Sequence, residues 1–112
     1  MIRRKRDGVD FVWFEGQVSL DEGEVAELHQ SVQPSSPTNP VKLVVSLEGI
    51  QLVRTAAWGK LMLLHQEIVK AGGQFKLCHL ETPVQDCLEV MKLHRLFDVA
   101  VTEEDARRAI QS

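Results

Sequence analysis

The chain has 112 residues, of which 44% are hydrophobic, and this suits one compact domain with a sizeable core. Its 13 basic and 16 acidic residues give a net charge of −3, which creates no field to attract nucleic acid or an anionic membrane. No apolar run approaches the ~20 residues that span a bilayer, and the start MIRRKRDGVDFVWF lacks the apolar region and cleavage site of a signal peptide. We therefore expect a cytoplasmic protein without membrane insertion, and partners that are recognised by shape and local chemistry.

The basic run RRKR at positions 3–6 allows two interpretations, a small anion-binding arm or a frayed, solvated terminus, and we favour the second because terminal residues are usually poorly ordered. This places a basic N-terminal segment at residues 1–9 and a folded domain at residues 10–112. The apolar run Phe11 to Phe14, followed by Gly16 and Val18, predicts two short strands in a hairpin-like pair.

A first helix is predicted from SLDEGEVAELHQSV, where Ser19 and Glu22 form a capping-box pattern and apolar residues recur at helical spacing. The segment QPSSPTNP, residues 33–40, holds three of the four prolines and predicts a loop. The β-branched run VKLVVSL then favours a strand that is covered on both faces, as in the centre of a parallel sheet.

The clearest helix follows, because apolar residues recur at helical spacing up to a glycine at the expected C-terminal cap, Gly72. The apolar positions of this helix are Ala57, Leu61, Leu64, Ile68 and Ala71. QFKLCHL predicts a strand, and TPVQDCLEVMKL predicts a helix with Thr82 as N-cap and Pro83 at its first position. The buried stripe predicted for that helix is Val84, Cys87, Leu88 and Met91.

A last short strand is predicted in HRLFDVAV, and Thr102 with Asp105 opens a terminal helix. Strands thus alternate with helices along most of the chain. This order predicts an α/β domain, a small mixed and partly parallel sheet with helices packed on it through right-handed crossovers.

Signs of catalysis or of a cofactor are few. The histidines fall on different predicted elements without metal-ligand spacing, at His29, His65, His79 and His94. Cys87 lies on a predicted core stripe, where a thiol is inert. Neither a phosphate-binding loop of the GxxxxGK[ST] type nor a GxGxxG motif is present. We therefore expect no metal, no cofactor and no enzyme activity.

The strand-to-helix junction GIQLVRTAAWGKL, residues 49–61, places Thr55 where an N-cap would lie. One interpretation is that Thr55 only caps the helix, for about 1 kcal/mol. The other is that its hydroxyl accepts a phosphate, because a helix N-terminus stabilises the roughly −1.5 to −2 charges that a phosphate adds.

The order of elements and several motifs resemble the STAS domain, the fold of bacterial anti-sigma factor antagonists. In that family a strand with an apolar-Gly-apolar step leads to an Asp-Ser-Ser/Thr-Gly-Leu turn, then to a helix with a Gly-Gly exit, a strand, and a Pro-initiated helix closing on a Leu-x-x-Leu-Phe type ending. Matching positions here are Gly49, Gly59, Leu61, Gly72, Gly73, Pro83, Leu88, Leu93, Leu96 and Phe97. The resemblance covers about residues 10 to 105 and implies a single small mixed sheet with helices on it.

The resemblance implies a non-enzymatic module that binds a serine/threonine kinase with a histidine-kinase-type fold, itself an anti-sigma factor, and thereby regulates transcription. Phosphorylation of the hydroxyl residue at the helix start, Thr55 here, would release the kinase. An alternative is the STAS subunit of a bacterial lipid-transport ABC system, in which Thr55 contacts the ATPase subunit and carries no phosphate. This chain departs from the family turn at Arg54, Ala56, Ala57 and Trp58.

The residues expected to bind the partner are Arg54, Thr55, Ala56, Trp58, Lys60 and Met62. Arg54 would hold a phosphate through a charge-assisted hydrogen bond, and it reverses the charge that the usual kinase meets. Trp58 has two interpretations, an exposed aromatic anchor at the interface or a large residue packed beside the sheet.

Overall fold

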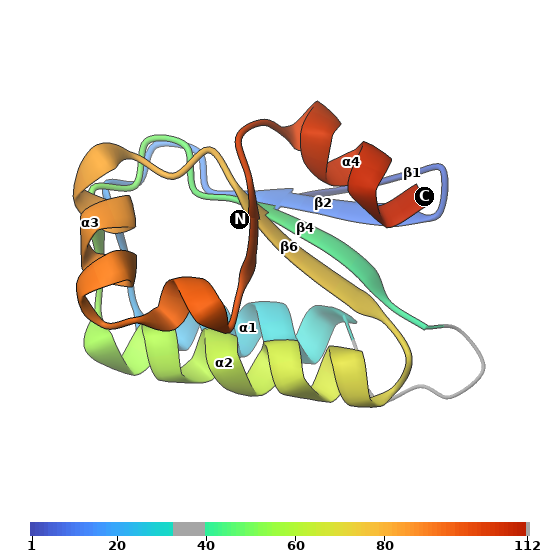
Figure 1. The fold of residues 1–112 in the computed structure, drawn as a ribbon, viewed down its shortest axis with the longest axis horizontal. Coiled ribbons are helices and arrows are strands. Elements are labelled where there is room, and N and C mark those ends of the chain that lie inside the picture. The colour runs from blue at the N-terminus through green and yellow to red at the C-terminus, as the bar shows by residue number, and fades with distance from the viewer. Residues whose placement is uncertain (33–39, 112) are drawn as a thin grey trace.

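The computed structural model describes residues 1–32 and 40–111 of the chain. Five strands form a mixed sheet in the order β1-β2-β4-β6-β7, and two short strands, β3 and β5, form a separate parallel pair. Helices α1 and α2 run along one face of the large sheet, and α4 covers part of the other (Figure 1). The prediction of a small mixed sheet with helices packed on it is therefore confirmed.

The strands are β1 (Ile2–Arg6), β2 (Val9–Trp13), β3 (Ser19–Leu20), β4 (Lys42–Ser46), β5 (Leu52–Val53), β6 (Gln74–Cys78) and β7 (Asp98–Ala100). The helices are α1 (Glu22–Val32), α2 (Thr55–Lys70), α3 (Thr82–Val90) and α4 (Glu103–Gln111), with a short 3₁₀ turn at Leu93–Arg95. The predicted loop at residues 33–40 lies, apart from Pro40, outside the described residues.

The parallel part of the sheet follows the predicted pattern. β4 pairs in parallel with β2 on one side and β6 on the other, and β6 pairs in parallel with β7. Residues 43–46 of β4 are buried, as expected for a central strand covered on both faces. α2 buries Ala57, Leu61, Leu64 and Ile68 against the sheet, as predicted. Ala71, the fifth predicted apolar position, is half-buried and is itself the C-cap, so Gly72 lies one position beyond the cap.

The interpretation of the N-terminus as a frayed segment is wrong. Residues Ile2–Arg6 form β1, an edge strand that pairs antiparallel with β2 through a turn at Asp7 and Gly8. Both turn residues have positive φ angles, 54° and 79°, which is the geometry of a type I′ hairpin turn. β2 therefore pairs with the basic strand before it, and the predicted hairpin between residues 11–14 and Val18 does not form.

The predicted starts of α1 and α3 are displaced, whereas that of α4 is not. The capping box of α1 is made by Asp21 and Glu24, whose backbone N–H groups each donate to the other's carboxylate. Glu81, and not Thr82, is the N-cap of α3. The prediction for α4 is confirmed, because the Asp105 N–H donates to the Thr102 hydroxyl over 3.1 Å.

The buried stripe of α3 is narrower than predicted. Val84 and Leu88 are buried, whereas Cys87 is half-buried and Met91 is exposed. The helix ends at Val90, so Met91 lies at the C-cap and beyond the last turn that packs on the core.

Two glycines of the α2 region provide a matched test of this packing. A Cβ on Gly73 would overlap the carbonyl oxygen of Val41 and crowd Ile68, whereas a Cβ on Gly59 would meet open space. We predict that Gly73→Ala lowers the free energy of unfolding by more than about 2 kcal/mol. Gly59→Ala, in the helix interior, should raise it by roughly 0.5–1 kcal/mol. Urea unfolding measures both, and an unchanged midpoint for Gly73→Ala would contradict the close approach.

Candidate functional site at the start of α2

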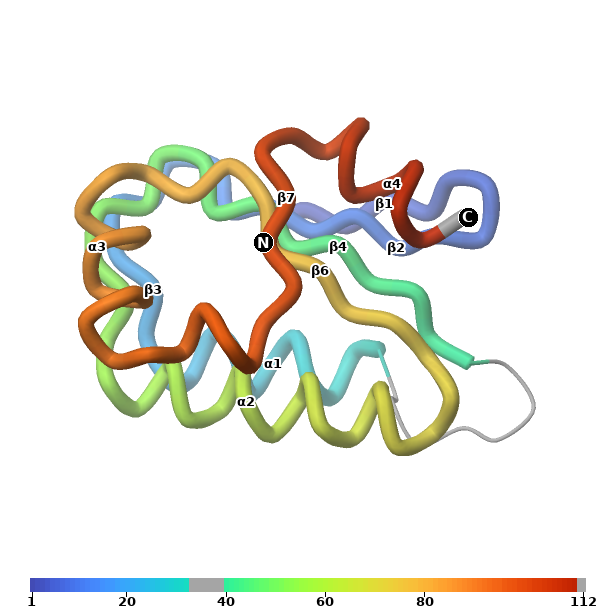
Figure 2. Tube along the Cα trace, viewed as in Figure 1, coloured from blue at the N-terminus to red at the C-terminus, as the bar shows by residue number. Residues whose placement is uncertain are grey.

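The start of α2 is held in place by the small β3–β5 ribbon. β5 pairs in parallel with β3, and the N–H of Arg54 donates to the carbonyl of Leu20 over 3.0 Å. The carbonyl of Val18 accepts from the N–H groups of Gln51 and Leu52. These main-chain bonds position the loop before α2 at the same end of the molecule as α3 (Figure 2).

Thr55 is the first residue of α2 and is exposed, so the prediction that it is the N-cap is wrong by one position. The N-cap is Arg54, whose backbone is extended and whose side chain makes no capping hydrogen bond. An arginine side chain has no acceptor atom, which explains why it leaves the first helical N–H groups uncapped. Among the described residues the Thr55 hydroxyl has no hydrogen-bond partner, so it is free to bind or react.

The start of α2 differs in charge from the starts of the other helices. α3 also has no acidic residue in its first turn, but its N-cap is Glu81, whereas the N-cap of α2 is Arg54. α1 has two glutamates in its first turn, and α4 has Glu103, Glu104 and Asp105, which complement the positive end of the helix dipole. α2 has no acidic residue in its first turn, and exposed Arg54 adds a positive charge beside it. The start of α2 is therefore a positively polarised surface that carries a free hydroxyl.

Trp58 is buried with 1% of its surface exposed, so its interpretation as an exposed anchor is wrong. It lies three residues before Leu61 and therefore shares the inner face of α2. Its ring packs at 6.0 Å from that of Phe97, centroid to centroid, and its indole nitrogen has no hydrogen-bond partner in the described structure. Trp58 thus anchors the helix start to the core, and it offers no surface to a partner.

The other predicted binding residues divide between surface and core. Ala56 is exposed beside Arg54 and Thr55, and these three adjacent residues form one surface. Lys60 is half-buried one turn further along α2. Met62 is half-buried and packs against the core, which makes it a supporting residue in the free protein.

Sequence reasoning missed two exposed apolar residues next to this surface. Val18 is 69% exposed and Leu52 is 49% exposed, and the Val18 carbonyl accepts the Leu52 N–H over 3.2 Å. The two residues are far apart in the sequence, and only the β3–β5 pairing brings them together. We use "the α2-start surface" for Arg54, Thr55 and Ala56 together with Val18 and Leu52.

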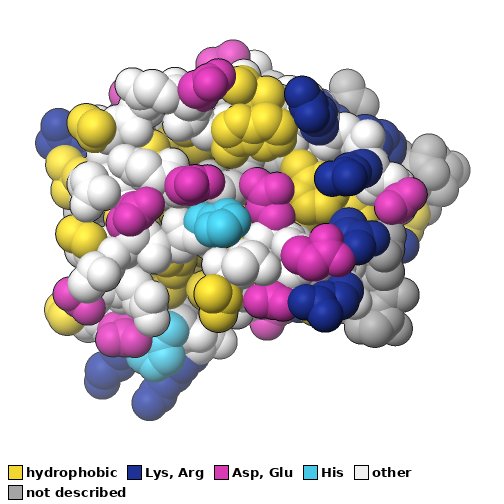
Figure 3. Space-filling model, turned by 90° about the horizontal axis from the view of Figure 1, so that it is seen from above, with side chains coloured by type: hydrophobic (Ala, Val, Ile, Leu, Met, Phe, Trp, Pro, Cys, Tyr) yellow, Lys and Arg dark blue, Asp and Glu magenta, His cyan; other side chains and the backbone are white. Residues whose placement is uncertain are grey.

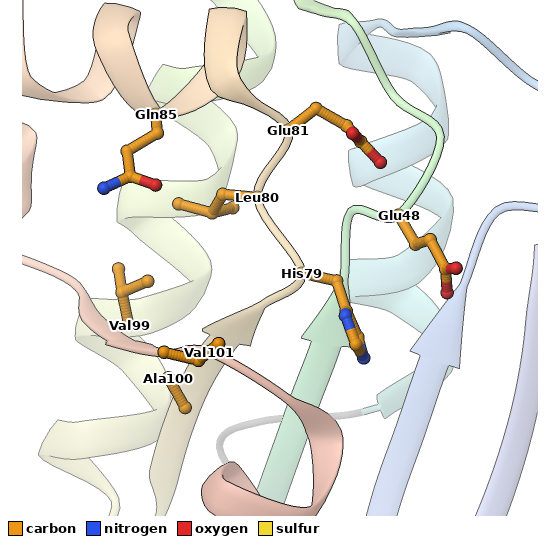
Figure 4. A pocket seen from close by; sticks show the side chains of 8 residues that line it. All are labelled: Glu48, His79, Leu80, Glu81, Gln85, Val99, Ala100 and Val101. Atoms are coloured by element: carbon orange, nitrogen blue, oxygen red, sulfur yellow. The ribbon is translucent and has the colours of Figure 1, made fainter.

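An open pocket of about 520 Å³ lies at the carboxyl ends of β4, β6 and β7. Figure 4 shows Gln85, Leu80 and Val99 on one side of it, and Glu48, His79 and Glu81 on the other. The carboxylate of Glu81 accepts from the N–H of Gly49 over 2.8 Å and so ties the start of α3 to the loop before α2. His79 has a positive φ of 53°, which turns the chain sharply after β6.

The described residues hold no cluster of three His, Cys, Asp or Glu side chains that suits a metal ion. Cys78 is buried, and desolvation as the largest cause raises the pKa of its thiol to about 12, so it is protonated at neutral pH. None of the described helices combines the length and the apolar character needed to cross a bilayer.

A family model for the STAS domain matches residues 2–106 of the chain. The match spans nearly the whole length and includes both sheet edges and the α2-start surface. The chain belongs to the STAS domain family. No curated protein sequence matches it.

Solved structures with the same fold come from bacteria and from a vertebrate transporter. A STAS domain protein from Planctomyces limnophilus has a TM-score of 0.83 at 20% identity, covering 99% of this chain and 97% of that one. An anti-sigma factor antagonist from Mycobacterium paratuberculosis has a TM-score of 0.77 at 21% identity, covering 99% and 92%. A murine Solute Carrier 26 anion transporter, family member A9, has a TM-score of 0.73 at 16% identity, covering 96% of this chain and 18% of that one.

The two tryptophans provide a direct test of the Trp58 position. Trp13 is half-buried beside Arg4, whereas Trp58 is enclosed in the core. We predict that the Trp13→Phe variant, which retains only Trp58, emits at shorter wavelength than Trp58→Phe and is quenched several-fold less by acrylamide. Circular dichroism confirms that each variant is folded. Equal quenching of the two variants would contradict the burial of Trp58.

His65 of α2 lies in a cluster of aromatic rings, and we predict from its position that the stability of the protein depends on pH. His65 packs 5.5 Å from the rings of both Phe75 and Phe97, and burial lowers its pKa below the ordinary value of 6.5. The native state then binds fewer protons than the unfolded state as pH falls through 6.5, so stability is fully present above pH 6.5 and declines below it.

We predict that His65→Gln removes part of this decline. The measurement is the free energy of urea unfolding for both proteins between pH 5 and pH 8, chosen as roughly one and a half pH units on either side of the ordinary histidine pKa. The difference between them isolates His65 from other titrating groups. A difference that is constant over this range would show that His65 titrates alike in the folded and unfolded chains.

Proposed function

We propose that this protein is a non-enzymatic regulatory module of the bacterial cytoplasm that binds a partner protein through the α2-start surface. The partner is a serine/threonine kinase with a histidine-kinase-type fold that acts as an anti-sigma factor, and phosphorylation of Thr55 releases it. One observation carries this proposal: Thr55 presents an exposed hydroxyl, without a hydrogen-bond partner in the described part of the chain, at a helix start that has no acidic residue in its first turn and an arginine as its N-cap. The likeness to an anti-sigma factor antagonist structure supports it.

The local electrostatics suit a phosphate at this position. The N-cap of α2 supplies no side-chain acceptor to the N–H groups of the first turn, and a phosphate oxygen accepts such bonds readily. The exposed guanidinium of Arg54 is adjacent and would add a charge-assisted bond. Phosphorylation would therefore change a positive surface into a negative one without disturbing the buried face of α2.

The same charges define the surface that the partner must present. Arg54 stands where the family turn carries an aspartate, so the partner of this protein should place an acidic group near it. Val18 and Leu52 add apolar area beside it, which a partner would bury on binding. A phosphate on Thr55 would then meet the partner's acidic group and weaken the complex by like-charge repulsion.

A second candidate function is favoured by the two exposed apolar residues. In this alternative the protein is a permanent STAS subunit of a lipid-transport ABC system, docked on the ATPase subunit. Permanent interfaces are more apolar than transient ones, which suits Val18 and Leu52. Thr55 would then be an interface contact that is never phosphorylated.

The first experiment is a pull-down from the source cells with the wild-type protein as bait, followed by mass spectrometry of the captured chain. Capture of a kinase with the histidine-kinase-type fold supports the phosphorylation switch, whereas capture of an ABC ATPase supports the permanent subunit. The intact mass of the protein purified from its own cells shows independently whether phosphate is attached.

The captured partner then allows a binding test of Thr55. We predict that Thr55→Glu weakens binding at least about tenfold, because it places a negative charge against the partner's acidic group. Thr55→Ser retains the hydroxyl and should bind as wild type. Thr82→Glu is the matched control, since Thr82 is also exposed at the first position of a helix. Calorimetry measures all three, and wild-type affinity for Thr55→Glu would contradict a charge switch.

A further inference from the structure

The outer edge of β1 pairs with no other strand in the described part of the chain. β1 lies at the end of the sheet order and pairs only with β2 among the described strands (Figure 1). A two-residue turn is closed by a pair that exchanges both hydrogen bonds, here Arg6 and Val9, and the bonded pairs then alternate along the hairpin. The bonded pairs include Arg4 with Phe11, so the N–H and C=O groups of Arg3 and Lys5 point away from β2.

This edge carries four consecutive basic residues in a chain whose net charge is −3. Arg3 donates to the carbonyl of Ser31 over 2.6 Å and forms an ion pair with Asp10 at 3.4 Å, on the face of the sheet that α1 covers. Arg4 lies on the opposite face, 5.8 Å from the centre of the Trp13 ring. Figure 3 shows basic side chains on the half of that face that holds the hairpin and α4, interspersed with acidic ones, several of which are ion-paired with the arginines of α4. The unpaired edge is therefore flanked by cations above and below the sheet.

We propose that the β1 edge binds an extended acidic segment of another protein as an added strand. The outward groups of Arg3 and Lys5 would supply main-chain hydrogen bonds. Side chains of the added strand would alternate between the two faces, where acidic residues would lie opposite the basic residues of β1. This surface is separate from the α2-start surface and serves a second partner.

The charges of β1 argue against a second copy of this chain as the occupant. Pairing two β1 edges would set two runs of arginine and lysine side by side, and like charges directly opposite each other destabilise a sheet. Basic edge strands also deter uncharged strands from adding to a sheet. The positive charges of β1 do not disfavour an acidic strand, because acidic side chains opposite arginine and lysine attract them across the two strands.

The test uses an acetylated, amidated hexapeptide of alternating glutamate and threonine, with a lysine–threonine hexapeptide as the control of reversed charge. Binding to the full-length ¹⁵N-labelled protein is followed by chemical shift changes and by amide hydrogen exchange. We expect the glutamate peptide alone to bind, with shifts centred on residues 2–6 and slower exchange at the amides of Arg3 and Lys5. Binding should weaken as salt is added.

Two variants separate strand addition from simple charge attraction. Lys5→Pro removes an outward N–H but leaves the bonded pairs of β1 and β2, and we expect it to abolish the slowed exchange at Arg3. Lys5→Gln is its control and should retain strand addition with weaker affinity. Should Lys5→Pro not fold, the charge-reversed variant Arg4→Glu with Lys5→Glu, whose backbone is unchanged, is expected to bind at least about tenfold more weakly.

Several results would overturn this proposal. They are the absence of binding, equal binding of both peptides, wild-type exchange protection in folded Lys5→Pro, or shifts centred on the α2-start surface. Dimerisation that sedimentation detects as concentration-dependent, with chemical shift changes at residues 2–6 on raising the protein concentration, would make a second copy the occupant and also overturn it. Because the peptide site is separate from the α2-start surface, Thr55→Glu should bind the glutamate peptide as wild type does. This result is expected whether or not Thr55 is phosphorylated in the cell.

Discussion

The burial of one face of α2 against the sheet is the interaction on which the candidate site depends. Trp58 and Leu61 are fully enclosed, and each large apolar side chain buried in this way contributes about 1.5–3 kcal/mol. Their positions fix the rotation of the helix about its axis. Arg54, Thr55 and Ala56 must then face solvent, so the exposure of the hydroxyl follows from the packing of residues one turn away. A surface held by a rigid helix is suited to recognition because its geometry is set before the partner arrives.

The parallel part of the fold was predictable because its signals are strong and local. The β-branched run that became β4 and the apolar spacing of α2 each specify one element, and alternating elements specify crossovers. β1 was missed because a strand rich in arginine and lysine has no apolar alternation, and its stability comes from pairing with β2. The sequence does carry a local signal for that hairpin in Asp7-Gly8, a preferred dipeptide of type I′ turns. The α1 capping box was displaced by two residues because Ser19 and Leu20 are drawn into the β3–β5 ribbon.

The candidate site was predictable only in part. Thr55 was identified from its place at the junction, but its exact role at the helix start depends on Arg54 taking the N-cap. Val18 and Leu52 were beyond sequence reasoning, because nothing local links two residues that only the β3–β5 pairing joins. Trp58 allowed two interpretations, since helical spacing places it beside the buried stripe without fixing whether the sheet covers it. These residues show that long-range pairing, more than local pattern, decides which side chains a surface contains.

The central claim is that a partner docks on the start of α2, and in-cell photo-crosslinking tests it most directly. A photoreactive amino acid is placed at Ala56 in one protein and at Val69, exposed near the other end of the same helix, in a second. Our account predicts a discrete crosslinked protein from position 56 and none from position 69. Crosslinking from position 69 alone would contradict it, since the partner would then bind the opposite end of α2.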